Sequence, residues 1–143
     1  MAEADLDIAY GLFCEFVRSE ATGKVTLIGV WPDQCRFLSA PPGLLPNIGL
    51  VIYVRNPRQQ PLHGRLRVYW PGTAAPIEIP IDVPAPPSAG GTYLVFNFAN
   101  PVFPTPGRLV ARIDLAPLAP RDYAVEIAFE PPGAALPAGT TAV

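Results

Sequence analysis

The sequence predicts an all-β fold, an antiparallel two-sheet β-sandwich of immunoglobulin-like or similar type. Short runs of Val, Ile, Leu, Tyr and Phe recur between clusters of proline and glycine, a spacing typical of sandwiches and barrels. Twenty prolines and 12 glycines interrupt the 143 residues, and proline is excluded from helix interiors. No stretch shows the apolar period of a long helix.

Nine strands are predicted, each bounded by turn-forming residues. Their ranges are 8–17, 24–31, 34–38, 47–55, 64–70, 77–83, 92–98, 108–113 and 122–130. No repeat or linker divides them, so residues 1–143 are expected to form one β-sandwich domain. The segment 131–143 has no apolar periodicity and is expected to be a flexible tail.

The middle three strands are predicted to form a meander of two hairpins. With Val54 opposite Leu66, every pair on one face of the first hairpin is apolar. With Trp70 opposite Ile77, the same face stays apolar in the second hairpin. Pro80 has no N–H to donate, so the strand that contains it is placed at a sheet edge.

The last two strands are predicted to pair in the same manner. Leu109, Ala111 and Ile113 would lie opposite Ile127, Val125 and Tyr123. Arginine and glutamate side chains then project from the other face. One face of this hairpin would therefore pack into the core, and the other would be exposed to solvent.

The first hairpin is predicted to be apolar on both faces. With Phe16 opposite Val25, the inner face would hold Tyr10, Leu12, Cys14 and Phe16, while Phe13, Ile28 and Val30 would point outward. A loop, a neighbouring strand or another subunit could cover these outer residues. The hypothesis drawn from them is self-association as a homodimer, with Phe13, Ile28 and Val30 at the interface.

Composition and charge argue against several classes of partner. Half of the residues are hydrophobic and 15% are charged, and the formal net charge is −2 without runs of either sign. Nucleic acid and membrane are therefore not expected as partners. The acidic N-terminus lacks the positive charge of a secretory signal, so a cytoplasmic location is expected.

Catalytic and metal-binding patterns are absent from the sequence, which favours a protein that is not an enzyme. His63 is the only histidine and lies in a turn, and no serine or cysteine stands in a nucleophile motif. The spacing of the carboxylates selects no catalytic pair. Cys14 and Cys35 are expected to be buried free thiols, because two cysteines in a reducing compartment rarely form a bridge. Neither a cofactor nor a metal is expected.

The most site-like group of side chains lies on the polar face of the predicted middle hairpin. It comprises Tyr53, Arg55, Arg65, Arg67 and Tyr69. Guanidinium groups beside phenol rings could hold an anion or a planar ligand. The competing interpretation is cross-strand pairing of Arg65 with Asp82 and of Arg67 with Tyr53.

The N-terminal pattern Val17, Arg18, Gly23, Lys24, Leu27, Ile28 and Gly29 resembles a family of uncharacterised small bacterial β-sandwich proteins. The resemblance extends over about residues 8–130. It implies a small β-sandwich and carries no established activity, so no site residue follows from it.

Two function hypotheses follow from the sequence. The first is a non-enzymatic protein-interaction or structural module that self-associates, because apolar residues are abundant and catalytic patterns are missing. The alternative is a small-ligand or anion-binding β-sandwich that uses the arginine and tyrosine face. A hydrolase is the least favoured function.

Overall fold

The computed structural model describes residues 5–21 and 23–131. Over this part of the chain the structure is all-β and contains no helix, which confirms the predicted class at that level. The strands are β1 (Asp7–Ser19), β2 (Val25–Trp31), β3 (Gln34–Phe37), β4 (Gly43–Leu44), β5 (Asn47–Arg55), β6 (Leu62–Tyr69), β7 (Ile77–Val83), β8 (Gly91–Ala99), β9 (Val102–Phe103), β10 (Gly107–Leu115) and β11 (Arg121–Phe129). Each of the nine predicted strands is present, and β4 and β9 are additional. The predicted tail lies, apart from Pro131, outside the described residues.

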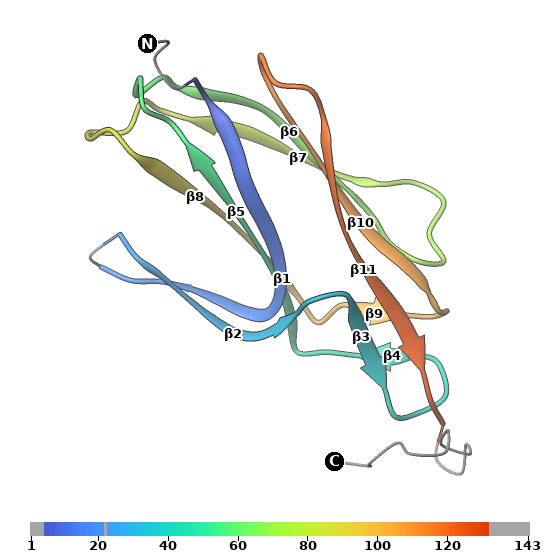
Figure 1. The fold of residues 1–143 in the computed structure, drawn as a ribbon. Coiled ribbons are helices and arrows are strands. Elements are labelled where there is room, and N and C mark those ends of the chain that lie inside the picture. Colours follow the sequence, from blue (N-terminus) through green and yellow to red (C-terminus); the bar gives the residue numbers. More distant parts are fainter. Residues whose placement is uncertain (1–4, 22, 132–143) are drawn as a thin grey trace.

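Nine strands form two larger sheets, which Figure 1 shows beside each other. Sheet A has the order β2-β1-β5-β8, and sheet B has the order β3-β11-β10-β6-β7. Neighbours are antiparallel except β3 and β11, which run parallel. β4 and β9 pair in a small separate sheet. β7 is an edge strand, as the proline within it predicted.

One core cluster draws on both larger sheets. Leu50 and Ile52 of β5 enter it from sheet A, and Leu66, Leu109 and Ile113 enter it from sheet B. All five are fully buried. Burying a side chain of this size contributes roughly 1.5–3 kcal/mol, so this shared cluster is the main stabilising contact between the sheets.

The predicted hairpin between β5 and β6 is wrong. β5 pairs with β1 and β8, whereas β6 pairs with β10 and β7, so Val54 does not pair with Leu66. The connecting loop crosses from one sheet to the other. Asn56 is fully buried in it and closes the turn, because its side chain donates to the Gln60 carbonyl at 2.8 Å and accepts from the Gln60 N–H at 3.1 Å.

Two other hairpins keep the predicted faces but are shifted by two residues. Ile77 pairs with Val68 rather than with Trp70, and Ile127 pairs with Gly107 rather than with Leu109. A shift of two retains the inward and outward faces, because the side-chain period of a strand is two. Trp70 instead leaves the strand and packs against aromatic rings near the core.

The first hairpin is shifted by three residues, so its predicted faces are inverted. Phe16 pairs with Ile28, because the turn is tight and Ser19 already pairs with Val25. Phe13 is 4% exposed and belongs to the core, so its prediction as an interface residue is wrong. Ile28 and Val30 are exposed as predicted.

Candidate ligand-binding site

The structure does not bring the five predicted site residues together. Tyr53 and Arg55 lie on sheet A, and the other three lie on sheet B. In both strands the alternate residues enter the core, so these five side chains point away from the shared core on two different sheets. Their separation follows directly from the crossing of the loop between β5 and β6.

The arginines of sheet B are neutralised by carboxylates of the same face. Arg67 Nε lies 2.7 Å from Glu78 Oε1, and Arg65 lies 3.8 Å from the same oxygen. Asp82, the predicted partner of Arg65, instead lies 2.9 Å from His63 Nδ1. The hydrogen bond from Arg67 and its charge lower the pKa of Glu78. This face is therefore a set of exposed ion pairs, as the competing interpretation proposed, but Glu78 is the partner in place of both Asp82 and Tyr53.

On sheet A, Tyr53 belongs to a different aromatic group, the tyrosine row, which consists of Tyr10, Tyr53 and Tyr93. The three residues are direct neighbours on β1, β5 and β8. The ring centroids of Tyr10 and Tyr53 are 5.5 Å apart at an interplanar angle of 22°, and those of Tyr53 and Tyr93 are 4.8 Å apart at 47°. The row therefore crosses three strands on the outer face of the sheet.

The phenol of Tyr10 keeps its proton over the physiological range. Partial burial, a hydrogen bond with Tyr93 and the repulsion between neighbouring phenolates raise the pKa of Tyr10 to about 12. A protonated phenol can donate as well as accept a hydrogen bond. Tyr10 therefore offers a neutral donor beside the aromatic surface of the row.

The hairpin of β1 and β2 packs over part of this outer face. A second buried cluster consists of Cys14 and Val17 of β1 and Val51 of β5, with Val25 and Val95 packed against it. Gly49 permits the close approach, because a Cβ atom there would lie 2.8 Å from Val17 Cγ2. The two apolar faces predicted for the hairpin are thus partly covered from within the same chain.

Two asparagines of sheet A hold the hairpin in place by polar contacts. Asn97 accepts from the Val17 N–H at 3.4 Å and donates to the Val17 carbonyl at 3.3 Å. Asn47 donates to the Glu15 carbonyl at 2.8 Å and to Asn97 Oδ1 at 3.0 Å. These hydrogen bonds hold the hairpin against the outer face of sheet A.

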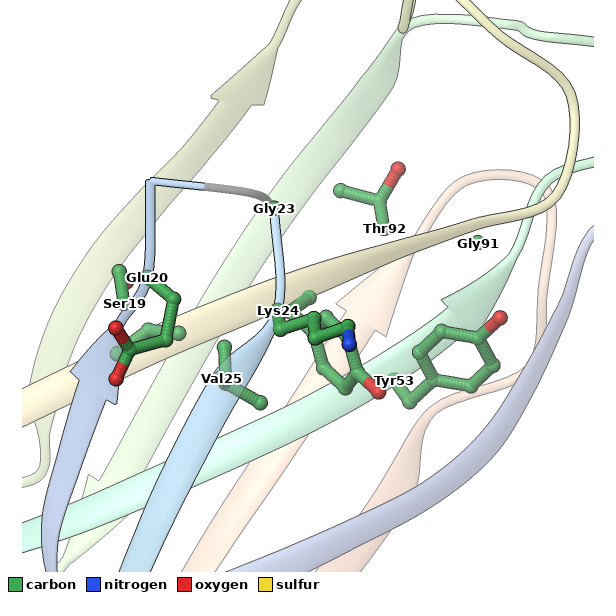
Figure 2. A pocket seen from close by; sticks show the side chains of 10 residues that line it. Ser19, Glu20, Gly23, Lys24, Val25, Tyr53, Gly91 and Thr92 are labelled. Atoms are coloured by element: carbon green, nitrogen blue, oxygen red, sulfur yellow. The ribbon is translucent and has the colours of Figure 1, made fainter.

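The packed hairpin leaves a cleft of about 400 Å³ between its turn and the tyrosine row, here called the turn cleft (Figure 2). Its walls come from the turn and its floor from β5 and β8. It is lined by Ser19, Glu20, Gly23, Lys24, Val25, Tyr53, Gly91, Thr92, Tyr93 and Val95. The volume is within the range of small-molecule sites, about 300–1,000 Å³.

Lys24 is the only lysine of the sequence and its charge is uncompensated within the described residues. In Figure 2 its side chain extends over the cleft toward Tyr53. Glu20, the only acid of the lining, is instead 3.7 Å from Arg18 and accepts from the Thr26 hydroxyl at 3.0 Å. No acidic group of the described chain lies within 4 Å of the Lys24 ammonium. The turn cleft therefore presents a free cation beside phenol and hydroxyl groups.

A second hollow, of about 270 Å³, lies on the other side of Tyr53. Asp5, Arg55, Pro57 and Gly90 line it together with Tyr53. Arg55 is paired with Asp7 at 3.2 Å, so its charge is already balanced. Of the predicted arginine and tyrosine residues, Tyr53 and Arg55 thus line adjoining hollows on one face.

Sequence reasoning missed Tyr10, Tyr93 and Lys24. Tyr93 alternates with the core residue Leu94, which places it on an outer face, whereas Tyr10 reaches that face through an irregularity of β1 between Ile8 and Tyr10. Their meeting depends on the order β1-β5-β8, which no local pattern encodes. Lys24 was assigned to the predicted strand 24–31 and to the resemblance pattern, but not to a site.

The two cysteines, His63 and Asp82 lie in surroundings typical of structural residues rather than of a reactive site. Cys14 and Cys35 are buried and unbridged, as predicted, and burial raises the pKa of both thiols, that of Cys35 to about 11. His63 and Asp82 are both exposed on the outer face of sheet B. Within residues 5–21 and 23–131 no three His, Cys, Asp or Glu side chains are grouped closely enough to hold a metal ion.

Neither a scan against protein-family models nor a search of curated proteins found a match to this chain. The resemblance to a small bacterial family therefore stays a prediction from the sequence. The described chain has no helix of the length and apolar character needed to cross a membrane.

Proposed function

We propose that the protein is a non-enzymatic binding domain that holds a small organic anion in the turn cleft. The observation that carries this proposal is the uncompensated Lys24 ammonium at a cleft whose floor includes Tyr53 and Tyr93. An anion that neutralises this cation gains a charge-assisted hydrogen bond, which is about twice as strong as a neutral one.

The lining also defines the rest of the ligand. Phenol and hydroxyl groups of Tyr93, Ser19 and Thr92 can donate to oxygen atoms, whereas Val25 and Val95 offer apolar surface. A carboxylate attached to a compact ring meets both requirements. The sequence also led to an anion-binding hypothesis, but with arginines as the cations. The proposed site lies on sheet A instead, and its cation is Lys24.

The finer fold assignment belongs to the same proposal. Two sheets that share one core, antiparallel except for the pair β3 and β11, support an immunoglobulin-like two-sheet sandwich. The two buried free thiols support a reducing, cytoplasmic location.

The proposal is tested by thermal unfolding with benzoate, with its neutral analogue benzamide and with inorganic phosphate. A ligand at 100 times its Kd adds about 2.7 kcal/mol, which raises Tm by roughly 5–11 °C for a domain of this size. We expect benzoate to stabilise the protein and benzamide to have little effect. Lys24→Met should abolish the shift, Lys24→Arg should retain most of it, and the control Arg108→Met on sheet B should not change it. An equal shift in Lys24→Met would contradict the proposal.

Self-association is a second candidate, favoured by an apolar patch on the hairpin. Phe16, Ile28 and Val30 are 42%, 48% and 43% exposed, although all three are large and apolar. They lie on or next to β2, which is an edge strand of sheet A. Antiparallel pairing of β2 with β2 of a second copy would be self-complementary and would close a two-fold dimer. Phe16 takes the place of Phe13 in this proposed interface.

A further inference from the structure

Glu20 lines the turn cleft together with Lys24, and the two residues lie opposite each other across the turn of the β1–β2 hairpin. The Glu20 N–H donates to the Lys24 carbonyl at 2.8 Å, which continues the register of the pair Ser19 and Val25. Residues opposite each other in an antiparallel pair have Cβ atoms about 4.5–5.5 Å apart. The backbone therefore brings an acid and a base close enough to form an ion pair.

The two charged groups nevertheless point away from each other. The Glu20 carboxylate lies 3.7 Å from Arg18 Nε and accepts from the Thr26 hydroxyl at 3.0 Å, and no ion pair within the described chain joins it to Lys24. Figure 2 shows the carboxylate and the Lys24 ammonium on opposite sides of Val25. The cleft therefore presents an anion and a cation with apolar surface between them.

The Glu20 carboxylate can accept a further donor. Both of its contacts are made by Oε1, so Oε2 has no hydrogen bond or ion pair within residues 5–21 and 23–131. An ionised carboxylate offers about four lone-pair sites on its two oxygens. The Arg18 side chain is 74% exposed, and an exposed ion pair contributes little, so Arg18 competes weakly with a ligand cation.

We propose that the ligand of the turn cleft is a zwitterion, an α-amino acid with an apolar side chain. Its carboxylate would bind the Lys24 ammonium, and its own ammonium would donate to Glu20 Oε2. Its side chain would pack on Val25 and Val95. Because this inference names the ligand class of the same cleft, it rests on the proposed function.

Charge and spacing favour this class over other anions. A simple carboxylate compensates Lys24 but leaves Glu20 Oε2 without a partner, and a dianion adds a negative charge beside Glu20, which weakens binding. The two charged groups of an α-amino acid are bonded to one carbon atom. This short separation suits a cation and an anion on opposite residues of one turn, and it leaves the ligand side chain free for the apolar wall.

The test compares L-phenylalanine with 3-phenylpropanoate, which is the same molecule without the ammonium group, and with phenethylamine, which lacks the carboxylate. Isothermal titration calorimetry measures the three affinities. We expect phenylalanine to bind about fivefold more tightly than 3-phenylpropanoate, which corresponds to about 1 kcal/mol. Phenethylamine should bind most weakly of the three, because it leaves Lys24 uncompensated and places a second cation in the cleft.

Two substitutions separate the roles of the two charges. Glu20→Gln removes the negative charge and can still accept from the Thr26 hydroxyl, so the preference for phenylalanine should fall from about fivefold to about one. Lys24→Met should abolish binding of both carboxylates. The matched control Glu126→Gln removes an exposed acid of sheet B, which lies 3.0 Å from Arg108, and should retain the preference.

Two outcomes would overturn this inference while the anion site stands. The first is equal affinity of phenylalanine and 3-phenylpropanoate for the unmodified protein. The second is retention of the preference in Glu20→Gln, which would assign the ammonium to the faces of the tyrosine rings instead. Failure of benzoate and of all three probes to bind would overturn the proposed function as well.

Discussion

Gly64, within sheet B, and Gly91, at the turn cleft, show that the effect of an added methyl group depends on what surrounds it. A Cβ atom on Gly64 of β6 would lie 1.8 Å from the backbone oxygen of Asp114, which cannot move without breaking the sheet. A Cβ atom on Gly91 would lie 2.0 Å from the hydroxyl oxygen and 2.1 Å from Cζ of Tyr53, so the ring of this half-buried side chain would have to move, while the backbone would not. The same substitution therefore has different consequences at the two positions.

We predict that Gly64→Ala lowers the free energy of unfolding by about 3 kcal/mol and that Gly91→Ala lowers it by less than about 1 kcal/mol. Gly91→Ala should instead displace Tyr53 from the floor of the turn cleft and weaken benzoate binding. Urea denaturation and benzoate titration of both variants check this. The interpretation fails if Gly91→Ala is the more destabilising of the two.

Cys35 links stability to alkaline pH. Because burial raises its pKa from 9.0 to about 11, the thiol of the unfolded chain ionises first as the pH rises. The unfolded state then binds fewer protons than the folded state, and the free energy of unfolding falls between these two values.

We predict that Cys35→Ala removes the decrease in the free energy of unfolding that the Cys35 thiol causes at alkaline pH. Urea denaturation at about pH 8 and about pH 10.5 measures it, since the interval spans the ionisation of the unfolded thiol. The unmodified protein should lose more stability over the interval than the variant does. Equal losses in the two proteins would show that the folded thiol is not protected.

Among the elements, the hairpin of β1 and β2 determines whether the turn cleft exists. Its position depends on the second cluster and on the bonds from Asn97 to Val17. Removing the amide leaves the N–H and carbonyl of Val17 without their side-chain partner, at a cost of about 1–3 kcal/mol. The hairpin should then open more readily than the rest of sheet A.

We predict that Asn97→Ala speeds hydrogen exchange at the Val17 amide by at least about tenfold, which corresponds to about 1.4 kcal/mol. Exchange at Leu109, in the core of sheet B, serves as the internal control and should change little. A uniform increase at both amides would mean that the asparagine stabilises the whole fold rather than the hairpin.

The strands themselves could be predicted from the sequence, because apolar alternation and proline-rich boundaries are local signals. Alternation also assigned Leu50 and Ile52 correctly to the core face of β5. Registers were less accurate, since they depend on turn length. In the first hairpin a turn three residues tighter than predicted moved Phe13 into the core and Phe16 to the surface.

At the scale of the whole molecule, strand order could not be predicted, and the candidate site depends on it. The segment after β5 has the composition of a hairpin loop, yet Asn56 folds it into a crossing between sheets. A hairpin register with matched apolar pairs also existed for β5 and β6, so pairing energy alone did not exclude it. Tyr53 was the only residue of the tyrosine row included in the predicted site.

We predict that the protein is dimeric in solution through the hairpin patch. Ile28→Glu would bury a charge in the contact and should yield a folded monomer, because this side chain is 48% exposed within one chain. Leu38→Glu, at an exposed apolar residue outside the patch, should remain dimeric. Sedimentation of the three proteins checks this, and a monomeric unmodified protein would remove the premise.

An anion site in the turn cleft is tested at the level of single residues by a nuclear magnetic resonance titration of the labelled protein with benzoate. The structure predicts shift changes that cluster at Lys24, Thr92 and Tyr93 and that disappear in Lys24→Met. Shift changes centred on Arg65 and Arg67 of sheet B, or none at all, would contradict it.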